Sequence, residues 1–492
     1  MDQGGNPIGS APTGTALTGS TPSATSPAAP LLATRVADHA RARTDARTCA
    51  ASLAHGPRVL LVANNFPPVR GGSAVVYDTL ARYGAGKVIV LAATQSYADG
   101  LPLIGWREHD RQAPYKVIRL RLLRTVLGNA PAAGWGARAW FRLGDLAIRA
   151  RMLATVLRLI LFGRVRAVCI GELVSAGWLF PALRPFPFVR RVVYMHGEEI
   201  TTSDGYDDDF RRRRRYVAGA QRIVAVSRFT RAATARLLAP AGRSAGGAPG
   251  GVPGDVIPSP AGRADDAAAA GRPDGDAGPR IVLIENGVDP QRFRPGPKRA
   301  DLLAYYGIEG AFVFVSVCRL LEKKGIDHAI RAFAAVAAAF PDCRYLVVGD
   351  GAFRERLGAI AAEEGVAERV VFTGQVAEEE LVDHYRLGDV FVMPNRELAN
   401  GDTEGFGLVF LEANACGLAV VAGCAGGSPD AVSDGVNGLV VDGRDVTAIG
   451  GALQRLRTDG ALRAALAARG LDVAAAADWR EKVGAFLGVC LG

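Results

Sequence analysis

Cysteine is scarce in this chain, with seven residues among 492. The count is odd, no Cys-x-x-Cys pair occurs, and most of the cysteines lie inside apolar runs. A disulfide framework or a thiol redox site is therefore not expected. We expect reduced and mostly buried thiols, as in a cytosolic protein.

Long hydrophobic runs and a secretory signal are also missing. The amino terminus has no basic segment followed by an apolar core, so we expect no signal peptide. The longest apolar stretch, residues 152–162, is interrupted by Arg158 and is shorter than the roughly 20 residues of a membrane-spanning helix. We predict a cytoplasmic protein whose membrane contact, if any, is peripheral and on the inner face of the cytoplasmic membrane.

The chain is basic. Its 58 Lys and Arg residues outnumber its 49 Asp and Glu residues, which gives a net charge of +9. Such a balance favours acidic partners: anionic lipid, nucleotide diphosphates or nucleic acid. The arginine run 211–215 directly follows three aspartates, 207–209. An Asp-x-Asp string can hold a metal, but this one follows no apolar strand. We predict an exposed helix start with acidic residues at its positive end and a solvated arginine face.

Length and composition predict two hydrophobic cores, because 492 residues with 49% hydrophobic content exceed one small domain. Residues 1–54 are rich in Ala, Thr, Ser, Pro and Gly and are predicted to be a disordered extension. Residues 240–279 are predicted to be a low-complexity insertion between two strands.

Short apolar runs alternate with helical stretches along the rest of the chain, the pattern of parallel sheets covered on both faces. We predict an α/β protein with two Rossmann-like domains, residues 55–296 and 297–477, and a final helical segment, 478–492. Ligands are expected at the carboxyl ends of the strands, in a deep cleft between facing domains. The predicted strands are 58–63, 87–91, 116–120, 166–170, 191–194, 222–226 and 281–284, then 312–317, 345–348, 370–372, 390–393, 419–422 and 439–441.

Two carboxylates, Glu404 and Glu412, are separated by seven residues, the first in a glycine turn and the second in an apolar helical run. Glycines at 405 and 407 let main-chain N–H groups approach a phosphate or a sugar closely. This segment, with 413–417 and 426–429 after it, resembles the signature of retaining nucleotide-sugar glycosyltransferases of family 4, which have the GT-B fold.

The resemblance implies a donor-sugar site around this turn. It places the catalytic Glu404 over the transferred sugar, with Gly405, Phe406 and Gly407 beside it. It assigns Glu412 to the ribose hydroxyls of the nucleoside. The implied fold has two Rossmann-like domains, and the last helix, Trp479 to Leu491, is expected to cross back onto the first domain.

Fixed cations are predicted to stabilise the leaving diphosphate. Arg319 and Lys324 follow a predicted strand, in a loop similar to the diphosphate-binding Arg-x4-Lys-Gly element of the family, which requires no metal or other cofactor. A βα loop is where open α/β sheets bind anions, and a forked guanidinium and a compact ammonium suit a diphosphate. The resemblance places Gly72, in the glycine loop 70–73, against the same diphosphate.

Three further positions are implied by the resemblance. His196 matches the active-site histidine that contacts the transferred sugar and supports charge at the reacting centre, although histidine also moves protons near neutral pH. Gly374 and Val376 match a main-chain contact to the nucleobase. Residues 286–289 match an element near the interdomain hinge. Residues 349–351 either line the same side as the nucleobase contact or form only a turn.

The family implies a nucleotide-diphosphate sugar as donor and a glycan or lipid-linked acceptor, with no nucleic acid. Resemblance of the carboxyl half to phosphatidylinositol mannosyltransferases favours GDP-mannose, while UDP-sugars stay open. The stretch 138–166, apolar residues interleaved with arginines, is either a sheet-covering helix or a contact to an anionic membrane surface. Alternatives from other classes are a non-catalytic polyanion- or membrane-binding protein on the same scaffold and a sugar-nucleotide epimerase.

Overall fold

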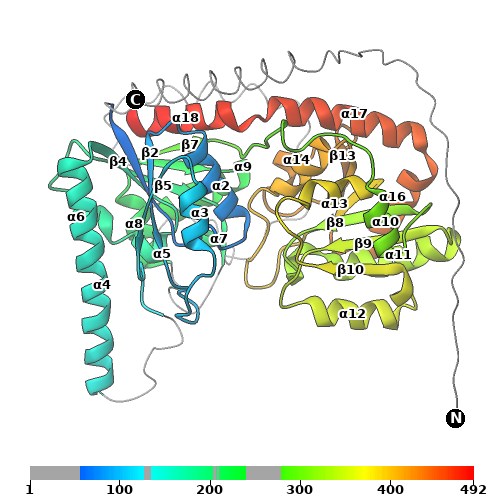
Figure 1. Ribbon diagram of the computed structural model, residues 1–492, viewed down its shortest axis with the longest axis horizontal. Helices are drawn as coiled ribbons and strands as arrows, with labels where there is room; N and C mark the ends of the chain where they lie inside the picture. Colours follow the sequence, from blue (N-terminus) through cyan, green and yellow to red (C-terminus); the bar gives the residue numbers. More distant parts are fainter. Residues whose placement is uncertain (1–55, 127–134, 203–206, 208–209, 240–278) are drawn as a thin grey trace, which may run out of the picture. The chain divides into compact units, whose positions relative to one another are not determined.

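The computed structural model describes residues 56–126, 135–202, 207, 210–239 and 279–492. Leu53–Gly492 form one compact unit, which holds two separate parallel β-sheets (Figure 1). The predicted extension, 1–54, lies outside the described residues, as does the insertion 240–279 apart from Pro279.

The first sheet has seven parallel strands within the described residues, in the order β3-β2-β1-β4-β5-β6-β7. Its interior strand β1 pairs with β2 and β4, so that Leu60 lies opposite Ile89 on one side and Val168 on the other. Continuous apolar runs occupy these strands because both faces are covered. All seven predicted strands are confirmed, and their bounds are β1 Arg58–Val62, β2 Val88–Ala93, β3 Lys116–Leu120, β4 Val165–Ile170, β5 Arg190–Met195, β6 Arg222–Ala225 and β7 Arg280–Leu283.

The second sheet has six parallel strands in the described part of the chain, in the order β10-β9-β8-β11-β12-β13. Its order changes direction at β8, which pairs with β9 and β11. Such a reversal is where open α/β sheets bind their ligands. All six predicted strands are confirmed, at β8 Phe312–Val317, β9 Cys343–Val348, β10 Val370–Gly374, β11 Val390–Met393, β12 Ala419–Gly423 and β13 Gly438–Val441.

Helices connect the strands in both halves. Those of the first half are α2 Gly72–Arg82, α3 Trp106–Gln112, α4 Trp135–Phe162, α5 Leu173–Ala176, α6 Leu179–Ala182, α7 Glu198–Thr201, α8 Arg211–Ala218 and α9 Arg228–Leu238. Those that follow are α10 Ala300–Tyr306, η3 Glu322–Lys324, α11 Ile326–Ala339, α12 Arg354–Glu363, η4 Ala367–Arg369, α13 Leu381–Leu387, α14 Leu408–Ala415, α15 Ser428–Ala431, α16 Val446–Thr458, α17 Gly460–Ala476 and α18 Trp479–Leu491. No helix among them is both long and apolar enough to cross a bilayer.

The last helix, α18, packs on the first sheet. It contacts β1, β4, β5 and β6 (Figure 1), and Phe486 packs edge-on against Tyr194 at 5.9 Å between ring centroids. Arg190 at the start of β5 donates a 3.0 Å hydrogen bond to the carbonyl of Val489. The chain that builds the second sheet is thereby anchored on the first.

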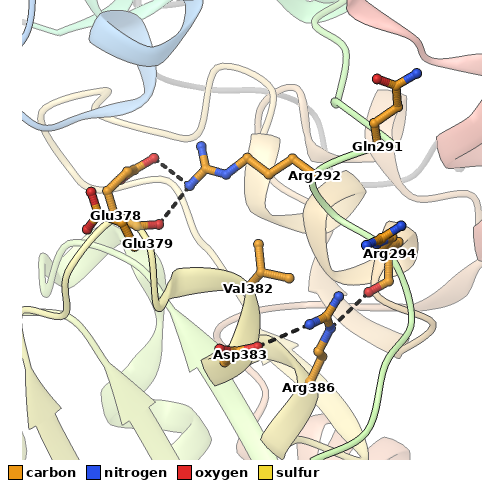
Figure 2. A pocket seen from close by; sticks show the side chains of 8 residues that line it. All are labelled: Gln291, Arg292, Arg294, Glu378, Glu379, Val382, Asp383 and Arg386. Carbon is orange, nitrogen blue, oxygen red and sulfur yellow. Dashed lines mark hydrogen bonds and ion pairs between the residues drawn. The ribbon is translucent and has the colours of Figure 1, made fainter. Parts of the chain in front are cut away.

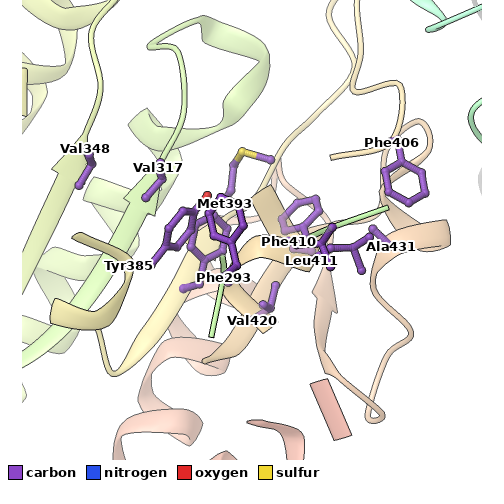
Figure 3. Close-up of a cluster of buried hydrophobic side chains, with 14 of the residues drawn as sticks. Phe293, Val317, Val348, Tyr385, Met393, Phe406, Phe410, Leu411, Val420 and Ala431 are labelled. Carbon is purple, nitrogen blue, oxygen red and sulfur yellow. The ribbon is translucent and has the colours of Figure 1, made fainter. Parts of the chain in front are cut away.

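Buried aromatic and aliphatic side chains lie directly beneath the strand ends of the second sheet. Figure 3 shows Phe293, Tyr385 and Phe410 in this cluster, with Phe406 at its edge. Phe410 and Tyr385 are fully buried, and both rings contact Phe391 of β11. This packing fixes α14 and the glycine loop before it.

The acidic string before α8 differs in part from its prediction. It does lie at a helix start, because the Asp207 carboxylate accepts hydrogen bonds from the N–H groups of Arg212, at 3.1 Å, and Arg213, at 2.7 Å. However, Asp207 is buried rather than exposed, since its oxygens satisfy orphan donors of the first turn. Arg213 is also buried, although the other arginines of the run are exposed or half-buried. Asp208 and Asp209 lie outside the described residues.

Candidate functional site

The loop after β8 carries Arg319 and Lys324, the predicted diphosphate ligands. It turns through the short helix η3 and reaches α11 at Gly325, whose φ is +73°. A Cβ at Gly325 would lie 1.9 Å from the carbonyl oxygen of Pro394, so only glycine fits this close turn. The cations are thus held at the carboxyl edge of the second sheet, where its order reverses.

Lys324 forms an ion pair with Glu404, the predicted catalytic carboxylate. Each side chain is only 14% exposed. Burial raises the pKa of Glu404, but the charge and hydrogen bond of Lys324, the charge of Lys323 and the N–H of Phe406 together outweigh burial, so the net pKa is lowered. Burial lowers the pKa of Lys324, but Glu404 reverses that effect and the net pKa is raised. Both groups are therefore charged near neutral pH.

The neighbouring Lys323 points elsewhere and supports the loop that leads to Glu404. Its ammonium is buried and lies 2.7 Å from the carboxylate of Asp402 and 3.3 Å from the carbonyl of Thr403. No role for Lys323 was predicted from the sequence. The motif in the sequence singles out Lys324 as a diphosphate ligand, but only the fold shows that this lysine, and not Lys323, pairs with Glu404.

The turn Gly405-Phe406-Gly407 has the close backbone packing that its glycines predict. A Cβ on Gly405 would lie 1.9 Å from the main-chain oxygen of His196, so the strand end after β5 abuts this turn directly. Gly407 has a φ of +91° and begins α14, and Phe406 is buried. The turn is therefore rigid and can present N–H groups to a ligand.

Glu412 lies within α14, as predicted, and accepts a 2.6 Å hydrogen bond from the hydroxyl of Tyr385 on α13. Burial raises the pKa of Glu412 to about 7, although the Tyr385 hydrogen bond and nearby Arg292 lower it. The carboxyl group thus titrates close to neutral pH. Tyr385 was not predicted as a partner from the sequence, because it lies in an ordinary helical segment.

His196 follows β5 and sits between two tyrosine rings, with ring centroids 5.1 Å from Tyr77 and 5.2 Å from Tyr194. Its Nε2 atom is buried without a hydrogen-bond partner among the described residues. Burial lowers the pKa of His196 to about 3. The imidazole is therefore neutral at physiological pH, and one of its nitrogens has unused hydrogen-bonding capacity among the described residues.

Two half-buried carboxylates that were not predicted from the sequence shape the first sheet's strand ends. Glu199 accepts hydrogen bonds from the main-chain N–H groups of His196, at 3.2 Å, and Gly197, at 3.0 Å. Glu172 accepts them from Asn64, at 2.6 Å, and the residue after it, at 2.9 Å. Burial raises the pKa of Glu199 to about 8 and that of Glu172 to about 7. No sequence pattern marks either residue.

The glycine loop before α2 faces the second sheet. A Cβ on Gly71 would lie 3.9 Å from the guanidinium carbon of Arg319, and one on Gly72 would lie 3.8 Å from a methyl group of Leu408. Gly72 is the first residue of α2. The loop predicted to hold the diphosphate and the predicted diphosphate cation are therefore neighbours.

The predicted base-contact segment lies at the end of β10. Gly374 has a φ of +68°, and its carbonyl accepts a 3.0 Å hydrogen bond from the N–H of Gly349. The carbonyl of Val376 accepts a 2.8 Å hydrogen bond from the guanidinium of Arg70. One main-chain group of Val376 is thus already in use, by a residue of the glycine loop.

The segments 349–351 and 286–289 have clear structural roles. A Cβ on Gly349 would lie 2.0 Å from the carbonyl of Cys318, so this segment is a tight turn against the Arg319 loop. Val288 exchanges main-chain hydrogen bonds with Ala477, at 2.9 Å, and with Trp479, at 3.3 Å. The segment 286–289 is thereby tied to the start of α18.

A pocket of about 410 Å³ lies between the segment 291–294 and α13 (Figure 2). Its charged side chains are largely paired, since Arg292 lies 2.6 Å from Glu378 and Arg386 lies 3.1 Å from Asp383. None of the predicted site residues lines it. The structure instead places Gly71 beside Arg319, Lys324 beside Glu404, and Gly405 beside the main chain of His196.

Comparison with known proteins bears on the family and the fold. Residues 303–472 match the family described as glycosyl transferases group 1. The GDP-mannose-dependent alpha-(1-6)-phosphatidylinositol monomannoside mannosyltransferase of Mycobacterium tuberculosis (strain CDC 1551 / Oshkosh) is 30% identical over 434 residues, which are 86% of this chain and 94% of that protein. The protein of the same name from Mycolicibacterium smegmatis is 44% identical over 197 residues, 39% of this chain, and this match spans about half of the relative, 52%.

Among solved structures, Anabaena HepE in complex with UDP and glucose has a similar fold, with a TM-score of 0.63 and 19% identity over 88% of this chain and 98% of that chain. This likeness supports the GT-B architecture that the two parallel sheets display. Because a relative matches along nearly its whole length and the family match spans all six strands of the second sheet, the chain belongs to the group 1 glycosyl transferases, enzymes that transfer sugars.

Proposed function

We propose that this protein is a retaining, metal-independent hexosyltransferase of family 4 that moves a mannosyl group from GDP-mannose to a lipid-linked phosphoinositol acceptor. The observation that carries the proposal is the meeting of the glycine loop, Arg319, Lys324, Glu404 and His196 at the strand ends of both sheets. The names of the mycobacterial relatives support this donor and acceptor class. A UDP-sugar is the competing donor.

The leaving diphosphate would be held by Arg319 and Lys324, with N–H groups near Gly72 on its other side. These fixed cations would stabilise the charge that develops as the bond between the anomeric carbon and the phosphate oxygen breaks. We therefore assign them the task that a metal ion performs in other transferases. Binding of the donor would draw the ammonium of Lys324 toward the phosphate, so that this ammonium interacts with both the phosphate and Glu404.

Retention of configuration is explained by attack on the same face of the sugar. The acceptor oxygen would bond to the anomeric carbon as the phosphate leaves, and the acceptor proton would pass to a phosphate oxygen. Glu404 and the turn 405–407 would grip the sugar hydroxyls, and the neutral imidazole of His196 would contact the sugar near the reacting carbon. Glu412 would bind the ribose, and the main chain at 374–376 the base.

The acceptor is assigned to the first sheet, and its lipid would keep the enzyme at a membrane surface on the cytoplasmic side. The 55–296 and 297–477 segments would then be the acceptor and donor domains. The 286–289 segment lies where the two meet and is assigned to the hinge between them.

Thermal unfolding against GDP-, UDP- and ADP-sugars tests the donor. A ligand at about 100 times its dissociation constant should add about 2.7 kcal/mol to the free energy of unfolding. We expect a selective shift with GDP-mannose that Arg319→Ala abolishes. An equal response to all sugars, or none, would contradict the donor assignment.

Product analysis tests the chemistry. Incubation with GDP-mannose and phosphatidylinositol mannoside should yield a new α-mannoside with chelator present. A β-linked product would contradict retention, loss of activity in chelator would contradict metal independence, and an altered nucleotide sugar without a glycoside would favour an epimerase.

A further inference from the structure

We infer that Arg119 and His109 are positioning residues for donor binding, because they hold the glycine loop in the shape that receives the diphosphate. Both act through the loop and its helix rather than on the donor itself. The inference rests on the proposed function, which gives the glycine loop the task of binding a nucleotide diphosphate. It adds to that site a network of charged side chains on β3, α3 and α2.

The connection between β1 and α2, residues 63–71, is poor in main-chain donors. It contains the pair Pro67-Pro68, and proline has no main-chain N–H group. Inside the connection the N–H of Val69 donates a 3.1 Å hydrogen bond to the carbonyl of Phe66, which forms a single turn. The glycine loop at the end of this connection therefore depends on side chains of other elements for its position.

Arg119 on β3 supplies such contacts at the middle of the connection. Its Nη2 donates a 2.6 Å hydrogen bond to the carbonyl of Pro67, and its Nη1 donates a 2.9 Å hydrogen bond to the carbonyl of Ala93 at the end of β2. The guanidinium carbon lies 5.3 Å from the centroid of the Phe66 ring, which is fully buried. Because the side chain of Arg119 is only 5% exposed, it ties the connection firmly to the outer strands of the sheet.

The start of the connection is held from the other side of β1. Glu172, which follows β4, accepts hydrogen bonds from the main-chain N–H groups of Asn64 and of the residue after it. The far end of the connection is Gly71, where a Cβ would lie 3.9 Å from the guanidinium carbon of Arg319. A shift of the connection would therefore move the glycine loop relative to a cation of the proposed diphosphate site.

Two further side chains orient the guanidinium of Arg119. Asp110 on α3 accepts a 3.0 Å hydrogen bond from its Nε and a 2.7 Å hydrogen bond from its Nη2, a bidentate pair that fixes the guanidinium plane. The ring of His109 lies between two carboxylates, with Nδ1 3.1 Å from Asp110 and Nε2 3.3 Å from Asp78 on α2. Since α2 begins at Gly72, these contacts join the connection to the helix that follows it.

The bridge through His109 depends on its protonation. Both ring nitrogens face carboxylate oxygens, so the doubly protonated imidazolium is the form that donates to both. Burial lowers the pKa of His109, but the hydrogen bonds and charges of the two aspartates outweigh burial, so the net pKa is raised. The bridge is complete below the usual histidine pKa of about 6.5 and is lost as the pH rises through the raised pKa. Charged and titratable groups face this ring from each element packed against it: Asp78 and the more exposed Arg82 on α2, Asp110 on α3, Tyr115 before β3, and Arg119 on β3.

Calorimetric titration of the full chain with GDP tests the role of Arg119. Arg119→Gln should weaken GDP binding by about tenfold or more, because hydrogen bonds from a charged group to the connection are lost. The KM for the donor should rise with it, and kcat should change less. The matched control is Arg121→Gln, which removes the same charge from a guanidinium that bonds the exposed side chain of Gln95 at 2.8 Å and should leave binding unchanged.

A second control separates lost position from lost stability. Phe180→Leu alters a fully buried side chain in the core on the opposite face of the first sheet from Phe66. It should lower the unfolding temperature and leave the GDP affinity unchanged. Weaker GDP binding in Phe180→Leu equal to that in Arg119→Gln would show that general destabilisation, and not the position of the loop, controls binding, and would overturn the inference.

His109→Gln gives an independent measurement, which also carries the test if circular dichroism shows that Arg119→Gln does not fold. Its amide donates to one carboxylate, as a neutral imidazole would. GDP should bind about threefold more weakly than to wild type near pH 6, and the difference should vanish as the pH rises through the raised pKa of His109. A ratio of affinities that does not change with pH would overturn the role of His109.

The outcomes distinguish this inference from the proposed function. Wild-type protein that binds GDP, together with Arg119→Gln that binds it equally well, would overturn the inference and leave the donor assignment intact. Wild-type protein that binds neither GDP nor UDP would overturn the proposed function and the inference with it.

Discussion

The guanidinium of Arg70 donates a 2.8 Å hydrogen bond to the carbonyl oxygen of Val376, joining the glycine loop of the first sheet to the base-contact segment of the second. The bond is exposed and should contribute no more than about 1 kcal/mol to stability. Because it occupies one main-chain group of Val376, it also limits what a nucleobase can contact there.

Arg70→Ala should therefore leave the unfolding temperature almost unchanged while altering the KM for the donor more than kcat. Steady-state kinetics and thermal unfolding measure the two effects. Arg82→Ala is the control, because Arg82 pairs with Asp78 within α2 and should change neither parameter. A large fall in stability of Arg70→Ala would show that the bond holds the two halves together.

Glu404→Gln should lower kcat by at least about 100-fold, because a preorganised charge beside the transferred sugar is lost. Buried Lys324 also loses its partner, so we expect the protein to lose about 3 kcal/mol of stability and remain folded. GDP should still bind, since its phosphates can pair with Lys324. Glu397→Gln in the preceding loop is the control, and wild-type turnover in Glu404→Gln would refute the catalytic assignment.

Gly405→Ala should inactivate the enzyme, because the new methyl group would lie 1.9 Å from the carbonyl of His196 and must push the turn from the strand end. We expect at least about 100-fold lower kcat, given the sensitivity of reacting groups to small displacements. Gly484→Ala on α18 meets no atom within 4 Å and should preserve activity. Full activity in Gly405→Ala would mean that this close approach is not needed for turnover.

Donor affinity should depend on pH through Glu412, whose pKa is raised to about 7, chiefly by burial. The ionised carboxylate accepts hydrogen bonds from ribose hydroxyls better than the protonated form, so GDP affinity should rise from about pH 6 to about pH 8. Glu412→Gln should remove most of this dependence. Calorimetric titration of both proteins with GDP measures it, and identical pH profiles would exclude Glu412 as the titrating group.

Stability should fall in acid because of His196, whose pKa is lowered to about 3 by burial. The unfolded chain takes up a proton near pH 6.5 and the folded protein does not, so stability is complete above that pH and is lost as the pH falls toward 3. The loss should be of the order of 4 kcal/mol. His196→Gln should unfold less steeply with acid in denaturant titrations, and equal acid sensitivity of the two proteins would contradict a buried neutral imidazole.

Much of the fold was predictable from the sequence, for a physical reason. Strands buried on both faces are continuous apolar runs, so all thirteen were found, with the bounds of β11, Val390–Met393, matching those of the structure. The helix Trp479–Leu491 was also predicted with its observed bounds. The glycines of the 404–412 segment predicted its turn, because glycine is needed where backbone segments pack closely.

Partnerships between distant residues were not predictable, since they depend on how strand ends are placed beside one another. Asp207 is acidic and stands before an arginine run, which suggests exposure, but its oxygens bind the first turn of α8 and it is buried. Tyr385 and Glu199 lie in unremarkable helical sequence. Their roles follow only from the atoms that the fold brings to 2.6 Å and about 3 Å from them.

The sequence by itself therefore determined the two parallel sheets, the family resemblance and the candidate residues at the strand ends, because apolar runs and glycine turns are local features. Tertiary structure alone decided that Lys324 rather than Lys323 pairs with Glu404, that His196 is buried and neutral, and that Arg119 reaches the carbonyl of Pro67. Charge pairing, burial and exposure are properties of contacts between segments far apart in the chain, and they exist only once the sheets have formed.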